Sequence, residues 1–129
     1  MYVLCMGIAR QEPLVRSDKS SKRILVVFDN GARRSLIRGD VAYEICTPRK
    51  LLVPRVFVAT NGKKVSCWYV CGIAVEIGGR EVGVEAFLVD SLLVPMIFGA
   101  LDMEAYRIKI DLAGKFLDLS EFTGTMLAL

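Results

Sequence analysis

A run of five apolar residues that ends in an acid constrains this chain more than any other feature. Residues 24–28 read Ile-Leu-Val-Val-Phe, and Asp29, Asn30 and Gly31 follow directly. An uninterrupted apolar run is typical of a strand buried on both faces, because a half-exposed strand alternates apolar with polar positions. A carboxylate at the mouth of such a strand is costly unless a partner stabilises it or the protein uses it. We therefore interpret Asp29 as a candidate functional residue.

Asn30-Gly31 also has a simpler interpretation, as the turn of an ordinary hairpin. Asn-Gly is the strongest two-residue hairpin signal and would form a type I′ turn. The residues that follow argue against it, since Ala32-Arg33-Arg34 would pair a basic segment with the apolar residues 26–28. Taken on this segment alone, both interpretations stay open.

Composition limits the class of protein and the chemistry it can perform. At 129 residues the chain has the length of one domain, residues 1–129, and its 53% of hydrophobic residues is enough for a packed core. The net charge is only +3 and the basic residues are scattered, so we expect no nucleic-acid partner. The sequence contains no histidine, which excludes Ser-His and Cys-His nucleophile pairs. Acid–base chemistry is left to carboxylates, Lys, Tyr or Cys.

The cysteines, Cys5, Cys46, Cys67 and Cys71, match no zinc-site spacing, so we expect no metal and no cofactor. On one strand Cys67 and Cys71 would lie roughly 13 Å apart, too far for a disulfide. We interpret all of them as free thiols with buried structural roles in a reducing compartment. No apolar run approaches the roughly 20 residues of a membrane span. We therefore expect a cytoplasmic protein without a membrane partner.

Along the chain, the pattern predicts short strands joined by turns. Pro54 confines its strand to an edge or a bulge, and Asn61-Gly62 and Gly78-Gly79 mark hairpin turns. The expected strands are residues 2–9, 22–29, 51–58, 65–68, 69–77, 81–89, 92–98, 108–111 and 116–119. We expect a loop at residues 10–22, a short helix or turn at 38–45 with Asp40 as its N-cap, and a short helix at 101–106. Residues 120–129 have no pattern.

A rough internal repeat links the two halves of the chain. An apolar strand, then Gly-Ala, then a short helix occurs around Gly31-Ala32 and again around Gly99-Ala100. Two copies so far apart in the sequence do not make a solenoid repeat. They suggest two similar halves packed about a pseudo-twofold axis.

The run Phe28-Asp29-Asn30-Gly31-Ala32, followed by Ser35-Leu36-Ile37, resembles the signature of the retropepsin-like aspartic proteases. In that family an apolar strand leads to Asp-Thr-Gly-Ala or Asp-Ser-Gly-Ala, a polar pair and a short strand. Ile97, Phe98 and Gly99 match the apolar-apolar-Gly motif of the family's second half, and residues 101–111 resemble its helix and final strand. The resemblance covers about residues 23–119. It implies a mostly-β fold, a small closed β-barrel with one or two short helices.

The resemblance further implies an aspartic endopeptidase that is active as a homodimer. In such enzymes two neighbouring carboxylates share one proton, so one acts as base toward a water while the other donates to the peptide carbonyl. Ile97 stands where the second half would need an acid, so each chain would supply one carboxylate, Asp29. The implied partners are a second copy of the chain and an extended peptide or unfolded protein substrate.

The resemblance also assigns roles to two loops. Asn30, Gly31 and Ala32 would shape the active-site loop around Asp29. Asn30 departs from the family's Thr or Ser, whose hydroxyl ties the two loops together across the dimer, whereas an Asn amide is longer and planar. The hairpin of residues 56–68 would be the flap over the substrate, or else a plain surface hairpin. The flap residues expected at its tip are Val58, Ala59, Thr60, Asn61, Gly62 and Lys63.

Two other functions remain open from the sequence. The first is a catalytically silent dimer of the same fold that acts as a peptide-binding or dimerisation module. The second is an unrelated small β-barrel binding domain in which Asn30-Gly31 and Asn61-Gly62 are only turns.

Overall fold

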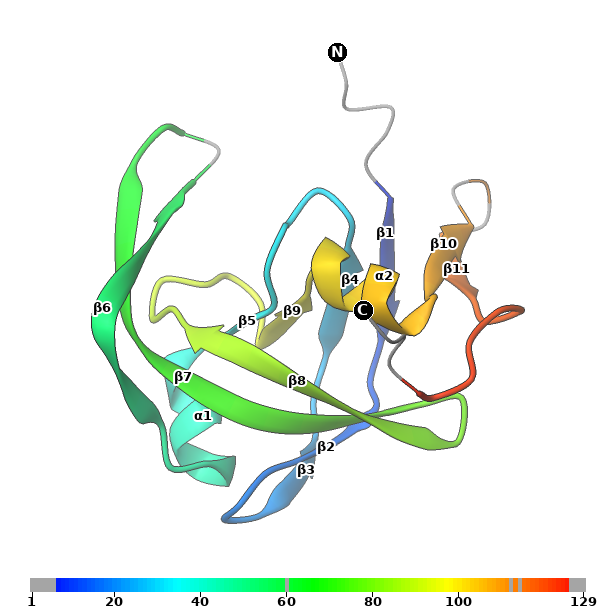
Figure 1. Cartoon of the computed structure of the whole chain (residues 1–129), viewed down its shortest axis with the longest axis horizontal. Coiled ribbons are helices and arrows are strands. Elements are labelled where there is room, and N and C mark those ends of the chain that lie inside the picture. Colours follow the sequence, from blue (N-terminus) through cyan, green and yellow to red (C-terminus); the bar gives the residue numbers. More distant parts are fainter. Residues whose placement is uncertain (1–6, 60, 112, 114, 126–129) are drawn as a thin grey trace.

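The structure is a computed structural model that describes residues 7–59, 61–111, 113 and 115–125. The described residues form many short strands and two short helices, which confirms the mostly-β prediction (Figure 1). The elements in chain order are β1 (Ile8–Gln11), β2 (Leu14–Arg16), β3 (Ser21–Arg23), β4 (Val26–Asp29), β5 (Leu36–Ile37), α1 (Gly39–Ile45), β6 (Arg49–Val58), β7 (Lys64–Ile77), β8 (Arg80–Leu88), β9 (Met96–Phe98), α2 (Ala100–Tyr106), β10 (Lys109–Asp111) and β11 (Phe116–Asp118).

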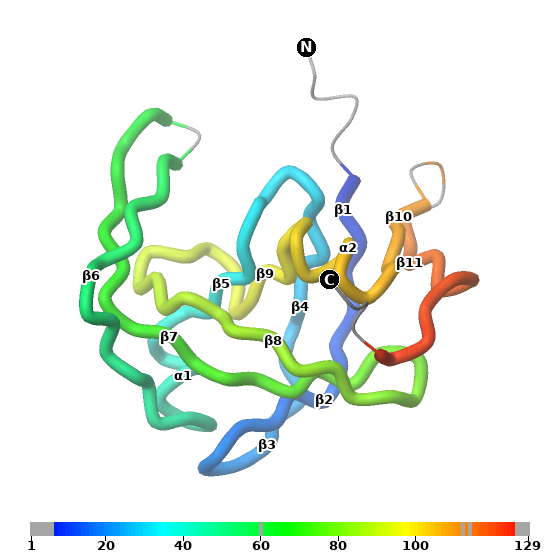
Figure 2. Tube along the Cα trace, viewed as in Figure 1, coloured from blue at the N-terminus to red at the C-terminus, as the bar shows by residue number. Residues whose placement is uncertain are grey.

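Nine of these strands form one curled sheet. Its order is β1-β4-β9-β5-β8-β7-β2-β3, with β6 paired to β7, and β10 and β11 form a separate hairpin. The short connections from β1 to β2 and from β3 to β4 bring the two ends of the sheet together (Figure 2). There the Ile24 N–H donates to the Pro13 carbonyl at 3.3 Å. The sheet is therefore barrel-like, although among the described residues no strand ladder joins its two ends.

The apolar run forms a buried strand with a neighbour on each side, next to the β1 end of this sheet, and its burial was predicted. Val26, Val27 and Phe28 are buried, and β4 pairs with β1 on one side and with β9 on the other. Phe28 stands opposite Phe98, and the ring centroids lie 4.9 Å apart. Because the neighbours of β4 are β1 and β9, the hairpin interpretation of Asn30-Gly31 is wrong.

The connection from β4 to β5 crosses over the end of β9. β9 runs parallel to β4 and antiparallel to β5, so it lies between two strands that follow each other in the chain. The residues of this crossing, 30–35, consequently lie next to Gly99 at the start of α2. The two Gly-Ala segments of the internal repeat meet at this point, where the Ala100 N–H donates to the Ala32 carbonyl at 2.7 Å.

Some predicted boundaries are wrong. Residues 10–22 are not a loop, because β1 extends into them and β2 and β3 form a hairpin there. This hairpin is attached to the sheet through Val15, which is fully buried and pairs with Val75, and one buried position leaves no periodic pattern to read. Of the strand predicted at residues 2–9, positions 1–6 lie outside the described residues.

Three further details also differ. The predicted strand at 22–29 is divided, since Lys22 belongs to β3 and β4 begins at Val26. The strand predicted at 92–98 is confined to β9, whose short length follows from the preceding Pro95. Asp40 is not the N-cap of α1, which is Arg38. Asp40 lies in the first turn and forms an ion pair with Arg38 at 2.7 Å.

The long strands confirm the predicted hairpins. Gly78 and Gly79 connect β7 to β8 with φ values of 55° and 80°, the positive angles that a type I′ turn requires. The register of β6 against β7 shifts between Lys50 and Arg55, around Pro54, and among the described strands β6 pairs only with β7. Both the edge position and the bulge that Pro54 allows are therefore present. The predicted break between a strand at 65–68 and a strand at 69–77 is wrong, since these residues form one strand, β7. No helix in the described part of the chain is long and apolar enough to cross a membrane.

The hairpin β6–β7 should exchange its amide hydrogens faster near its tip than the hairpin β7–β8 does. Val58, on the arm just below the tip, is 67% exposed, whereas Val75 and Val82 are buried and paired with each other. Exposed ladders open more often than ladders within a packed core. Hydrogen exchange followed by mass spectrometry or NMR measures this difference. Equal protection of the two hairpins would remove the basis for treating residues 56–68 as a flap.

Candidate active site

Asp29 is the last residue of the buried strand β4, and its side chain is half-buried. The Gly31 N–H donates to its Oδ1 at 2.8 Å, and the Ala32 N–H donates to its backbone carbonyl at 3.1 Å. Its other carboxylate oxygen has no hydrogen-bond partner among the described residues. The turn therefore fixes the orientation of the carboxylate and leaves one oxygen available to a ligand.

Asn30 is hydrogen-bonded within its own chain. The Gly7 N–H donates to Asn30 Oδ1 at 2.6 Å, and the Asn30 N–H donates to the Gly7 carbonyl at 3.1 Å. The backbone bond continues the pairing past Ile8 and Asp29, where the β1–β4 ladder ends, and the side-chain bond reinforces it. The amide thus attaches the loop to the segment before β1, and its acceptor oxygen is occupied without a second chain.

The loop after Gly31 is fixed against the start of α2. In addition to the bond from Ala100 to Ala32, the Leu101 N–H donates to the Arg33 carbonyl at 3.1 Å. A side chain at Gly99 would overlap the backbone of Arg34, so only glycine permits this approach. Gly99 therefore lies beside the candidate loop. Of the other residues in the second-half motif, Phe98 is buried, and Ile97 pairs with Val27 of β4.

Ser35 connects the same loop to α2 and is the buried polar residue of the described core, with 1% of its surface exposed. Its hydroxyl donates to Asp102 Oδ2 at 2.6 Å and accepts the Gly99 N–H at 3.0 Å. Burial raises the pKa of Asp102, while the bond from Ser35 and the nearby charge of Arg34 oppose the rise. Asp102 lies in the first turn of α2. Its hydrogen bond with Ser35 was not identified from the sequence.

The tip of the hairpin β6–β7 contains the predicted flap residues. The Ala59 N–H donates to the Lys63 carbonyl at 2.8 Å, and the Gly62 N–H donates to the Ala59 carbonyl at 2.9 Å. Three residues therefore separate the two arms, and the prediction of a two-residue turn is wrong. The Asn61 side chain accepts the Lys63 N–H at 2.9 Å, and Gly62 alone of the two has positive φ, 83°. Thr60 lies outside the described residues, and Val58 stands exposed on the arm below the tip.

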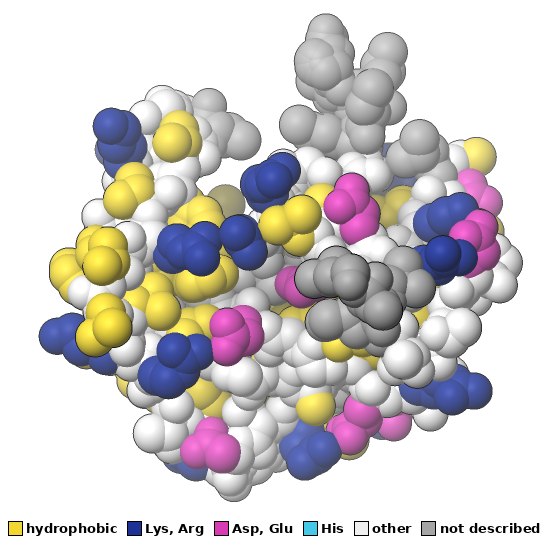
Figure 3. All heavy atoms as spheres, in the orientation of Figure 1, with side chains coloured by type: hydrophobic (Ala, Val, Ile, Leu, Met, Phe, Trp, Pro, Cys, Tyr) yellow, Lys and Arg dark blue, Asp and Glu magenta, His cyan; other side chains and the backbone are white. Residues whose placement is uncertain are grey.

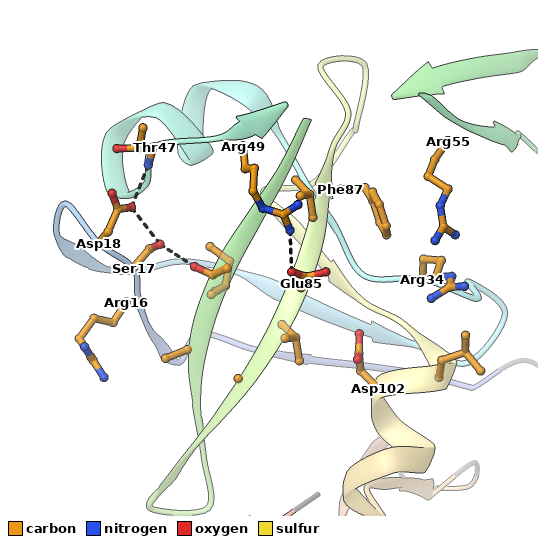
Figure 4. A pocket seen from close by; sticks show the side chains of 17 residues that line it. Arg16, Ser17, Asp18, Arg34, Thr47, Arg49, Arg55, Glu85, Phe87 and Asp102 are labelled. Atoms are coloured by element: carbon orange, nitrogen blue, oxygen red, sulfur yellow. Dashed lines mark hydrogen bonds and ion pairs between the residues drawn. The ribbon is translucent and has the colours of Figure 1, made fainter. Parts of the chain in front are cut away.

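A groove of about 930 Å³ lies beside the β4–β5 loop and was not predicted from the sequence. Figure 3 shows that basic side chains gather in the middle of this face, next to hydrophobic ones on the hairpin β6–β7. Figure 4 shows the groove from close by, with side chains that enter it from β6, β8, the β4–β5 loop and α2. Asp29 itself is not part of the lining. The lining residues used below are Arg34, Arg55, Glu85, Phe87, Leu101 and Asp102.

The described cysteines, Cys46, Cys67 and Cys71, are buried free thiols. Burial, together with the neighbouring Cys46, raises the pKa of Cys71, which is the state of an unreactive thiol. Cys5 lies outside the described residues. Within the described part, no group of three His, Cys, Asp or Glu side chains is placed to hold a metal ion.

Ser35→Ala should lower the free energy of unfolding by about 1–3 kcal/mol, because it leaves the buried Gly99 N–H without an acceptor and Asp102 without its donor. Urea denaturation at neutral pH measures the change. Ser120→Ala is the matched control, since that serine is exposed and the loss of its contact with Asp118 should cost little stability. Equal stability of the two variants would show that Ser35 does not fix the loop to α2.

No protein-family model matches the sequence, and no curated protein matches it. Among solved structures, the chain is similar to the crystal structure of the retroviral protease-like domain of Ddi1 from Leishmania major, with a TM-score of 0.54 and 14% sequence identity. The match covers 95% of this chain and 91% of that one. At this identity the likeness shows the fold alone. The chain thus has the retropepsin-like fold that its two motifs resemble.

Proposed function

We propose that this protein is an aspartic endopeptidase that acts as a homodimer, with Asp29 of each protomer forming the catalytic pair. The observation that carries the proposal is the position of Asp29 in a retropepsin-like fold. The carboxylate ends a buried strand, accepts one backbone N–H from Gly31 and keeps an oxygen without a partner in the described structure. A group held in this way is oriented for chemistry before the substrate arrives.

In the proposed dimer, the two Asp29 carboxylates lie near the twofold axis and share a proton, since two like charges at close range cannot both ionise. The ionised carboxylate takes a proton from a water, and the water oxygen attacks the peptide carbonyl. The protonated carboxylate donates its proton to the carbonyl oxygen. The Gly31 N–H holds each carboxylate in place during these transfers. No cofactor enters the proposed reaction.

The need for a second chain is supported by the residue at the matching position of the second half. Ile97, on β9 next to β4, is apolar, so one chain offers a single carboxylate at this place. A symmetric pair of chains supplies the same residue twice across one axis.

The hairpin β6–β7 supports an extended peptide as the substrate. Among the described strands β6 pairs only with β7, so its outer edge is available for backbone hydrogen bonds to an added strand. Val56 and Val58 on this strand are exposed and offer apolar contacts. The buried free thiols of the described part support the expectation of a reducing, cytoplasmic compartment.

One observation favours a second candidate, a catalytically silent module that binds peptides or dimerises. Asn30 Oδ1 is occupied by Gly7 of the same chain, whereas the resemblance implies a hydroxyl that links two chains at this position. A pair of loops without that link is less firmly held, and it could bind a peptide without cleaving it.

Asp29→Ala should abolish cleavage of an unfolded protein substrate and leave the fold intact, because the carboxylate lies at a strand end and outside the packed core. Turnover in the wild type should rise more steeply than protein concentration and be blocked by a statine-type peptide inhibitor, since the dimer is the active form. Asp118→Ala is the matched control, because Asp118 also accepts the N–H two residues ahead but lies on β11.

Cleavage that survives Asp29→Ala would exclude the aspartic mechanism. Analytical ultracentrifugation gives a second measurement. A protein that stays monomeric at micromolar concentration, even with the inhibitor present, would count against a homodimeric enzyme.

Asn30→Thr should keep or raise turnover, because a short hydroxyl can reach the partner loop as the resemblance implies. It should also lower the free energy of unfolding by about 1 kcal/mol through loss of the bond to Gly7. Turnover, the dimer dissociation constant and urea denaturation are measured for wild type, Asn30→Thr and Asn30→Ala. If the threonine variant is weaker both as a dimer and as an enzyme, the amide is itself an adapted part of the site.

A further inference from the structure

Two arginines reach the same end of the groove from opposite walls. Arg34 comes from the loop that follows Asp29, and Arg55 comes from β6, the first arm of the candidate flap (Figure 4). Arg55 lies over the ring of the buried Phe87, with 5.3 Å from its guanidinium carbon to the ring centroid. Stacking on a ring holds the guanidinium plane in place and leaves its N–H groups available at the edge.

The other arginines of the groove already have acidic partners. Arg16 is paired with Glu81 at 2.7 Å, and Arg49 is paired with Glu85 at 2.8 Å. Arg34 and Arg55 take part in no salt bridge within the described residues. Arg34 and Arg55 therefore differ from Arg16 and Arg49 in having no carboxylate within ion-pair distance, although the charge of Arg34 still acts on the nearby Asp102.

The acidic residues that line the groove accept hydrogen bonds from groups other than these two arginines. Asp102 accepts the Ser35 hydroxyl, Glu85 is held by Arg49, and Asp18 accepts the Thr47 N–H at 2.8 Å. Two guanidinium groups that share one end of a groove repel each other. A carboxylate placed between them would relieve this repulsion and accept charge-assisted hydrogen bonds from both.

We propose that the Arg34–Arg55 end of the groove binds an Asp or Glu side chain of an extended polypeptide, so that acidic segments are the preferred substrates. The inference rests on the proposed peptidase function for cleavage, although the binding step does not require it. One arginine lies on the loop that follows Asp29 and the other on β6, so the acidic residue would lie between the two segments to which the proposed function assigns the substrate. Phe87 and Leu101 would contact the aliphatic part of the bound side chain.

The charges of the groove favour a peptide over a nucleic acid. Asp18, Glu85 and Asp102 line the same groove as the two arginines. A chain of phosphates that followed the groove would meet all three carboxylates, whereas a single acidic side chain between the two guanidinium groups would have a cation on either side of it. Nucleic-acid affinity also needs several cations to neutralise successive phosphates.

The test uses an unstructured, fluorescein-labelled peptide with a central apolar pair. At each of several positions around that pair, three versions are compared, which carry Glu, Gln or Lys. Binding is measured by fluorescence anisotropy on protein that carries Asp29→Ala, so that no peptide is consumed. Cleavage of the same peptides is measured with Asp29 intact. Arg34→Gln, Arg55→Gln, Arg34→Lys and Arg55→Glu are compared with Arg23→Gln, which replaces an exposed arginine on β3 outside the groove.

At one position of the peptide, Glu should bind about tenfold more tightly than Gln. Arg34→Gln and Arg55→Gln should each remove most of this preference and leave the affinity for the Gln peptide unchanged. Arg34→Lys should retain part of it, and Arg55→Glu should turn the preference toward the Lys peptide. Arg23→Gln should behave as the parent protein.

The two proposals fail in different ways. Arginine-dependent binding of the Glu peptide without any cleavage supports the inference and contradicts the peptidase function. Cleavage with equal rates for Glu and Gln peptides, unaffected by the arginine variants, overturns the inference and keeps the peptidase. Tighter, Arg34- and Arg55-dependent binding of a single-stranded oligonucleotide than of the Glu peptide would overturn the assignment to a peptide. The unfolding midpoint of each variant is compared with that of the parent protein, so that a loss of the preference for Glu is not mistaken for unfolding.

Discussion

The parallel pairing of β4 with β9 is the contact on which the rest of the molecule depends. It aligns the buried Phe28 and Phe98 and brings together strands that are far apart in the sequence. Since β5 pairs with the other side of β9, the chain has to cross the end of that strand. The crossing segment follows Asp29 directly and ends at Ser35. The position of the candidate catalytic loop is thus a consequence of how the central strands are ordered.

Hydrogen bonds then fix that loop in three directions. Asn30 bonds to Gly7 before β1, Ala32 and Arg33 accept N–H groups from α2, and Ser35 bonds to Asp102 and Gly99. The backbone of Arg34 passes so close to Gly99 that a side chain there would not fit. A loop held in this way can present one carboxylate in a constant orientation. It can also hold a cation beside the groove without an ion pair of its own.

Local pattern was enough to predict the parts of the fold that are encoded locally. The buried strand was visible because residues 26–28 are apolar without interruption, and the β7–β8 turn because Gly78 and Gly79 can both take positive φ. The bond from Ser35 to Asp102 was not visible, since it joins residues from different halves of the chain. β2 was missed because its attachment to the sheet depends on the single buried Val15. The groove between Arg34 and Arg55 exists only once the hairpin and the loop have been folded side by side.

The two arms of the hairpin β6–β7 differ in how they continue into the molecule. β7 is one strand of 14 residues, and from Val70 to Ile77 it is paired with β8. β6 is interrupted in register between Lys50 and Arg55, and irregular pairing lets a strand bend. If the hairpin moves, β7 should keep its shape because it continues into the sheet, and β6 should bend where its register shifts, which makes that part of β6 the hinge. Arg55 lies at the end of that hinge, so opening of the hairpin would change the distance between the two arginines.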